Sequence, residues 1–141
     1  MTRLRAAAAT LLLLLCACSE PRPVAETLLR KIGPHALRSD AARLYKDLFA
    51  SRAAEYTAVK ESQWPKSFHR FRPLHVGAYV DGISITLLKD ADAEAGIYIV
   101  PLHMEFVPVS TPRAAFEPLV EGVYWFSFAD PPHARDGVVV P

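Results

Sequence analysis

The chain of 141 residues carries 16 Lys and Arg against 15 Asp and Glu, a net charge of +1 at pH 7. This near balance argues against a nucleic-acid-binding protein, which would show a strongly basic total or a long basic stripe. The length is enough to bury one hydrophobic core, so we expect a single folded domain.

The first 15 residues have the pattern of an export signal. Arg3 and Arg5 precede an uncharged, almost wholly apolar run, Ala6–Leu15, which ends in five leucines. A charged segment followed by about 7–15 apolar residues is typical of a secretory signal peptide. A membrane-spanning helix needs about 20 apolar residues, and Ser19 and Glu20 end this run well before that length.

The segment Leu15-Cys16-Ala17-Cys18 resembles the lipobox of bacterial lipoproteins. The resemblance implies that signal peptide 1–17 is removed and that Cys18 is acylated, so the lipid bilayer is a partner. Ser19 in place of aspartate favours the outer membrane, facing the periplasm. An ordinary secretory cut after Ser19, with Ala17 three residues before the cut, is the alternative.

Cleavage before Cys18 would leave 124 residues with a single cysteine. Acylation of this thiol would exclude a disulfide, a thiolate metal site and a cysteine nucleophile. We expect residues 18–23 to form the lipidated N-terminus and a tether, residues 24–130 one domain, and residues 131–141 a loosely ordered tail.

Two helices are expected in the first half of the domain. Pro23 suits a first helical turn, and Gly33-Pro34 is a strong stop after Ile32. A second helix is expected from Ser39, which is a good N-cap, toward Tyr56 and Val59, with a break near Ser51. Trp64-Pro65 would end it.

A β-hairpin is predicted at Asp81-Gly82, because this dipeptide separates two runs in which apolar and other residues alternate. A two-residue loop there would pair Val80 with Ile83, and would continue with Ala78 opposite Ile85 and Val76 opposite Leu87. All six apolar side chains would then share one face.

The remaining segments are read as one acidic loop, further strands and a connection. Asp90–Ala95 is the expected loop and 96–100 the third strand. Residues 102–109 are extended but interrupted by prolines, 111–118 are a connection, and 122–128 form an aromatic strand. In this last strand Tyr124, Phe126 and Phe128 are the expected core set.

Helices followed by strands predict an α+β fold, with N-terminal helices on one face of a 3–5-stranded antiparallel sheet. The segment from Trp64-Pro65 through Asp81-Gly82 to 96–98 is similar to a pattern of small uncharacterised bacterial proteins. The resemblance covers about a quarter of the chain and implies no activity.

No metal, cofactor or catalytic motif stands out. The five histidines, at positions 35, 69, 75, 103 and 133, have none of the close spacings typical of zinc ligands, and no serine lies in a GxSxG motif. His75 and His103 would meet on the second face of the sheet if their strands paired. The alternative function is therefore a small cell-envelope hydrolase whose His-centred site uses His75 or His103.

The charge layout indicates a possible interaction patch. Residues 63–75 hold three cations, two histidines and three aromatic side chains, and they hold no acid. The patch residues are Trp64, Lys66, Phe68, His69, Arg70, Arg72 and His75. These aromatic residues could instead complete the core while the cations pair with carboxylates of the sheet. The favoured function is a non-enzymatic binding module that contacts an envelope protein, an anion or a lipid headgroup.

Overall fold

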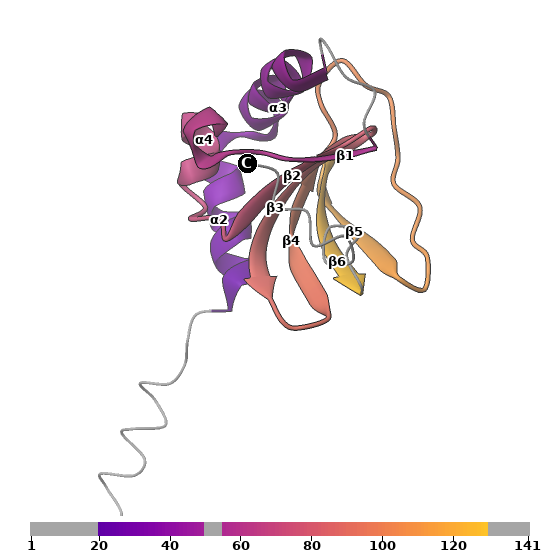
Figure 1. The fold of residues 1–141 in the computed structure, drawn as a ribbon. Coiled ribbons are helices and arrows are strands. Elements are labelled where there is room, and N and C mark those ends of the chain that lie inside the picture. The colour runs from indigo at the N-terminus through magenta and orange to yellow at the C-terminus, as the bar shows by residue number, and fades with distance from the viewer. Residues whose placement is uncertain (1–19, 50–54, 130–141) are drawn as a thin grey trace, which may run out of the picture.

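The computed structural model describes residues 20–49 and 55–129, and these form one α+β domain (Figure 1). The helical elements are α2 (Pro21–Ile32), α3 (Pro34–Phe49), the 3-10 helix η1 (Glu61–Gln63) and α4 (Lys66–His69). The strands are β1 (Tyr56–Ala58), β2 (His75–Tyr79), β3 (Gly82–Lys89), β4 (Ala93–Ile99), β5 (Ala114–Val120) and β6 (Val123–Ala129). The segment that resembles a lipobox and the expected tail 131–141 lie outside the described residues.

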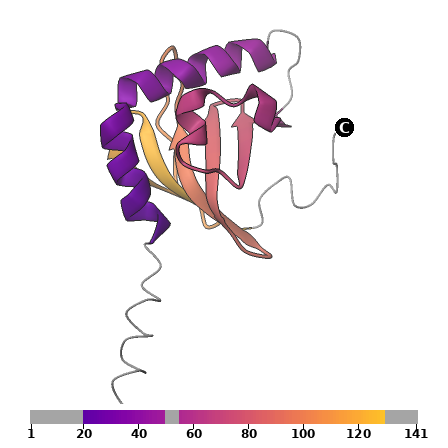
Figure 2. The same ribbon diagram turned by 90° about the vertical axis from the view of Figure 1, so that its left-hand side faces the viewer.

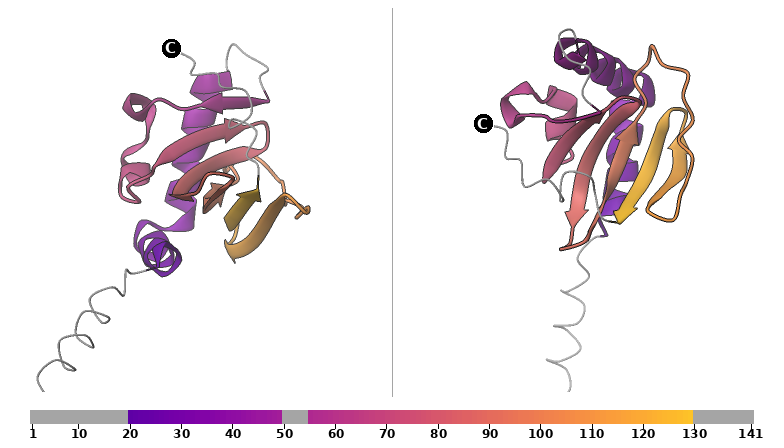
Figure 3. Two further views of the ribbon diagram at one scale, coloured as in Figure 1. Left: turned by 60° about the horizontal axis from the view of Figure 1, so that its bottom comes forward. Right: turned by 45° about the vertical axis from the view of Figure 1, so that its right-hand side comes forward.

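The strands form one antiparallel sheet in the order β1-β2-β3-β4-β6-β5. The α+β prediction is confirmed, although the sheet has six strands in place of three to five. The helices lie on one side of this twisted sheet (Figures 1 and 3). We call that side the helix face, and the opposite side the aromatic face after the rings described below.

The first helix ends where the sequence predicts. Two prolines occupy its first turn, where the missing N–H groups leave no bond unmade, and Gly33 follows Ile32 at φ 88°. The chain turns sharply there into α3 (Figure 2). The helix α3 begins at Pro34 in place of Ser39 and ends at Phe49.

The extension of the second helix to Tyr56 and Val59 is wrong. Tyr56 pairs with Tyr79 as part of the edge strand β1, and the Val59 amide donates to the Val76 carbonyl at 2.9 Å. The backbone N–H and C=O groups of this segment therefore form their hydrogen bonds with β2, as part of the sheet, and not within a helix. The expected break near Ser51 lies outside the described residues.

The hairpin is present, but its register differs from the prediction. Tyr79 pairs with Gly82 and Ala78 with Ile83, so the two loop residues are Val80 and Asp81. The pairing is displaced by two positions, which preserves the faces. Val76, Ala78, Ile83 and Ile85 are therefore buried as expected, whereas Val80 is 58% exposed.

Three segments before the last strand differ from their predictions. The extended stretch 102–109 contains no strand, and the expected connection 111–118 contains most of β5. Strand β4 begins at Ala93, so Glu94 is a buried strand residue and not part of the acidic loop. The final aromatic strand is confirmed as β6.

The main core lies between the helices and the helix face. The helices contribute Ala25, Leu29, Leu37, Ala41, Leu44 and Phe68, the connections contribute Val59 and Phe71, and the strands contribute Val76, Ala78, Ile83, Ile85, Ile97, Ile99, Val123 and Trp125. Strand β6 is buried on both faces, because Phe126 and Phe128 belong to a second cluster with Tyr98. The expected core set of β6 therefore lies on the face away from the helices, and Tyr124 there is only partly buried.

Candidate functional site

The structure divides the predicted interaction patch into buried and exposed parts. Phe68 is fully buried, and Trp64 is half-buried with its indole N–H donating to the Val59 carbonyl at 3.0 Å. The side chains of Lys66, His69, Arg70 and Arg72 are exposed. The aromatic residues therefore anchor the segment while its cations face outward.

His75 does not belong with these cations. It lies on the aromatic face, where its Nε2 is 2.5 Å from the Tyr56 hydroxyl. In the described part of the chain, Lys66, Arg70 and Arg72 form no ion pair within 4.0 Å. The expected pairing of these cations with carboxylates of the sheet is therefore wrong for the residues described.

The aromatic face carries a chain of contacting rings that come from five strands, β1, β2, β4, β5 and β6. Ring centroids are 5.0 Å apart for Tyr56 and Tyr79, 5.9 Å for Tyr79 and Phe128, and 5.7 Å for Phe116 and Phe128. Several of these pairs meet edge to face, which the ring quadrupoles favour. The face is therefore largely a second packed layer of side chains.

Polar groups are buried at one end of this ring layer. The Thr86 hydroxyl donates to Glu94 Oε2 at 3.4 Å, and Lys89 Nζ lies 3.6 Å from Glu94 Oε1. Glu94 is 3% exposed. Thr86 also pairs with His75 across β2 and β3. Polar and ionisable groups from three strands thus meet on this face.

Burial changes the acidity of the tyrosines on the aromatic face. Loss of hydration raises the pKa of Tyr56 and Tyr79 above 10. The pKa of Tyr98 is raised by burial and also by its hydrogen bond to the Asp81 carboxylate. All three phenols therefore stay protonated and able to donate hydrogen bonds at neutral pH.

The histidines named as alternative catalytic groups are not brought together. His103 lies in the connection after β4, with its ring 5.6 Å from that of Tyr45 in α3. His75 is on the aromatic face with Tyr56. Within residues 20–49 and 55–129, no three His, Cys, Asp or Glu side chains are close enough to hold a metal ion.

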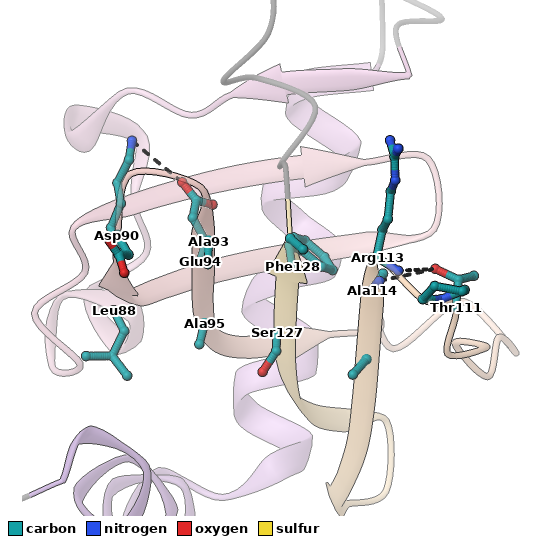
Figure 4. Close-up of a pocket in the computed structure, with 14 residues that line it drawn as sticks. Leu88, Asp90, Ala93, Glu94, Ala95, Thr111, Arg113, Ala114, Ser127 and Phe128 are labelled. Carbon is teal, nitrogen blue, oxygen red and sulfur yellow. Dashed lines mark hydrogen bonds and ion pairs between the residues drawn. The ribbon is translucent and has the colours of Figure 1, made fainter.

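An open hollow of about 550 Å³ lies at one end of the sheet (Figure 4). It is formed where β3 and β6 end and where β4 and β5 begin. Ala93, Ala95, Ala114, Ala115 and Phe128 give it an apolar lining. We call this end of the sheet, together with the first turn of α2, the basal end.

Charged side chains border the hollow on opposite sides. Figure 4 shows Glu94 with its ion pair on one side, Arg113 on the other and Phe128 between them. The partner in that ion pair is Lys89. Arg113 is exposed and, among the described residues, has no ion pair within 4.0 Å. The hollow thus combines an apolar lining with two cations, Lys89 and Arg113, and two acids, Asp90 and Glu94.

Sequence reasoning missed this hollow. The sequence predicts a connection at Ala114 and Ala115, and this prediction does not place Arg113 near Lys89. The sequence feature that could have indicated the hollow is the set of small residues at 93, 95, 114 and 115. These residues leave space where the β3–β4 and β5–β6 hairpins lie side by side. That signal requires the pairing of β4 with β6, which the sequence did not predict.

A smaller hollow of about 170 Å³ lies where α2 begins. Pro21, Val24, Phe71, Arg72 and Leu87 border it. The first turn of α2, the connection before β2 and the end of β3 therefore meet at the basal end.

Comparisons with protein-family models, with curated proteins and with solved structures found no match. Among the described residues, no helix is both long enough and apolar enough to cross a bilayer.

Proposed function

We propose that this chain is an exported protein, anchored to a membrane by acylated Cys18, that acts as a non-enzymatic binding module of the cell envelope. Within this proposal the outer membrane is favoured, with the domain in the periplasm. The binding site is the hollow of about 550 Å³ at the basal end, which we call the basal hollow. Its ligand carries one anionic group on an apolar body. Where the partner is an envelope protein, that protein presents such a group on its surface.

The observation that carries this proposal is the placement of Arg113 at the border of an apolar hollow. A guanidinium without an ion-pair partner in the described residues offers its donors to a carboxylate or phosphate. The alanines and Phe128 would contact the apolar body of the ligand. Ligand sites commonly combine an apolar lining with a few placed polar groups.

The hydrolase alternative has less support. It relied on His75 and His103 meeting on the sheet, whereas His103 contacts Tyr45 and His75 contacts Tyr56. A general base needs a reacting group within hydrogen-bond reach. The described partner of His75 is a phenol whose pKa is raised by burial, which makes that phenol a poor nucleophile.

Replacing Arg113 by alanine is expected to weaken the binding of dodecanoate about tenfold. A hydrogen bond to a charged group contributes about 1.5–3 kcal/mol, and the exposure of Arg113 favours the lower value. Isothermal titration of the two proteins with dodecanoate measures the change. Arg30→Ala is the matched control, because Arg30 is an exposed arginine near the other end of α2. Equal affinity of the Arg113→Ala variant and the original protein, or no saturable binding by either, contradicts the proposed site.

Replacing Cys18 by serine is expected to move the protein from the membrane fraction to the soluble fraction of the envelope. Two or three acyl chains hold a protein at a bilayer persistently, whereas one gives only marginal binding. Mass spectrometry of the mature N-terminus checks the modification directly. Recovery of an unmodified tryptic peptide that starts at Glu20 would show the secretory cut after Ser19 and rule out the anchor.

A further inference from the structure

We infer that the basal end rests on the surface of the bilayer that holds the anchor. The contact is made by an apolar rim, defined as Val24, Leu74 and Leu88. This inference rests on the proposed acylation of Cys18, and it adds an orientation: the hollow opens toward the lipid headgroups.

The rim residues come from three separate elements that meet at the basal end. Val24 is 45% exposed, Leu74 61% and Leu88 44%. Val24 borders the small hollow together with Leu87, the neighbour of Leu88 in β3. The Leu74 amide donates to the Thr86 carbonyl at 2.9 Å, which holds Leu74 beside the same part of β3. Three large apolar side chains are therefore exposed around the start of α2.

The short distance along the chain from Cys18 to α2 restricts where this rim can lie. Only three residue steps separate Cys18 from Pro21, where the helix begins. Three extended residues span at most about 10 Å. The headgroup layer on each side of a bilayer is about 5–8 Å thick. Acyl chains on Cys18 would therefore hold the first turn of α2, and the rim beside it, within or next to the headgroup layer.

The charges near the rim suit a mainly apolar contact. Arg72 borders the small hollow, and Lys89 and Arg113 border the large one. Asp90 and Asp92 lie in the turn between β3 and β4 at the same end, and Glu94 borders the large hollow, so these three acids balance the three cations. Apolar side chains that enter the boundary between headgroups and acyl chains give membrane contact without a strongly basic surface.

The experiment uses the full acylated chain in vesicles of phosphatidylethanolamine and phosphatidylglycerol. Because Cys18 is blocked by acylation, a cysteine introduced at Leu74 or Leu88 is the only reactive thiol, and it accepts a polarity-sensitive fluorophore. Val80→Cys is the matched control, since Val80 is an exposed apolar residue in the β2–β3 turn at the opposite end of the sheet. Quenching by spin-labelled lipid is compared with quenching by a water-soluble agent.

We expect lipid quenching and a blue-shifted emission at positions 74 and 88, and aqueous quenching alone at position 80. Aqueous quenching at all three positions in a chain that mass spectrometry shows to be acylated overturns the docking but leaves the anchor intact. A chain without acyl mass overturns the anchor itself. Shielding of positions 74 and 88 that persists in detergent without vesicles indicates contact between copies of the protein, and it also overturns the inference.

Discussion

Raising the pH above about 10 is expected to lower the free energy of unfolding steeply. Tyr79 and Tyr98 have pKa values raised by burial, whereas tyrosines in the unfolded chain titrate near 10. A group whose pKa is raised in the folded state contributes its full stabilisation below the unfolded pKa. This contribution is lost as the pH rises from about 10 toward the folded value, because the unfolded chain then releases protons that the folded chain keeps.

Each such tyrosine contributes a slope of up to about 1.4 kcal/mol per pH unit, so two contribute up to about 2.7. Urea unfolding at a series of pH values from 8 upward, followed by circular dichroism, measures the total slope. Tyr98→Phe removes one titrating group and is expected to reduce the slope by about half of this amount. A slope that is unchanged by Tyr98→Phe would show that Tyr98 is not protected from ionisation in the folded protein.

Replacing Gly96 by alanine is expected to destabilise the fold by at least about 3 kcal/mol. A Cβ at this position would lie 2.0 Å from the Ile85 carbonyl oxygen and 3.0 Å from the Leu87 amide nitrogen. Both atoms belong to the backbone of β3, beside the register shift between Thr86 and Leu88, so β3 and β4 must separate to admit the methyl group. Overpacking of well-packed sites typically costs about 1–3 kcal/mol and sometimes more.

Gly77→Ala provides the comparison for this clash. The nearest atom to a Cβ at Gly77 is in the Tyr56 ring, at 2.7 Å. A side chain on the short edge strand β1 can rotate away, so the loss is expected to be smaller than at Gly96. The unfolding midpoint in urea of both variants measures the difference. A Gly96→Ala variant as stable as the Gly77→Ala variant would contradict the close approach of β3 and β4.

The hairpin shows why a local signal predicted an element but not its register. The dipeptide pattern predicts Asp81-Gly82 as the loop, yet Gly82 is the first residue of β3. A Cβ on Gly82 would lie 2.4 Å from the Tyr98 ring, and the Tyr98 hydroxyl donates to Asp81. Asp81 and Gly82 therefore both contact Tyr98 in β4. The sequence pattern of the hairpin alone does not predict this contact. Because the register is displaced by two positions, the alternation still placed the correct side chains on the helix face.

The interaction patch shows the same difference between composition and placement. Its residue types correctly indicated exposed cations next to aromatic residues, but Phe68 is buried in the core and His75 lies on the other face of the sheet. His75 is separated from the cations because it points to the face of β2 opposite to Val76 and Ala78, which pack in the core with the helices. The basal hollow was missed for the opposite reason, since its two cations are 24 positions apart and meet only through strand pairing.

The sequence by itself determined the α+β class, the stop at Gly33 and the alternation of the central hairpin. These depend on backbone preferences and periodicity within one segment. It also supplied the lipobox resemblance, on which the proposed anchor depends. Only the tertiary structure decided that β6 lies between β4 and β5, that β6 is buried on both faces, and that Arg113 and Lys89 border one hollow. Those features depend on contacts between residues far apart in the chain, whose side chains show no local pattern until the strands pair.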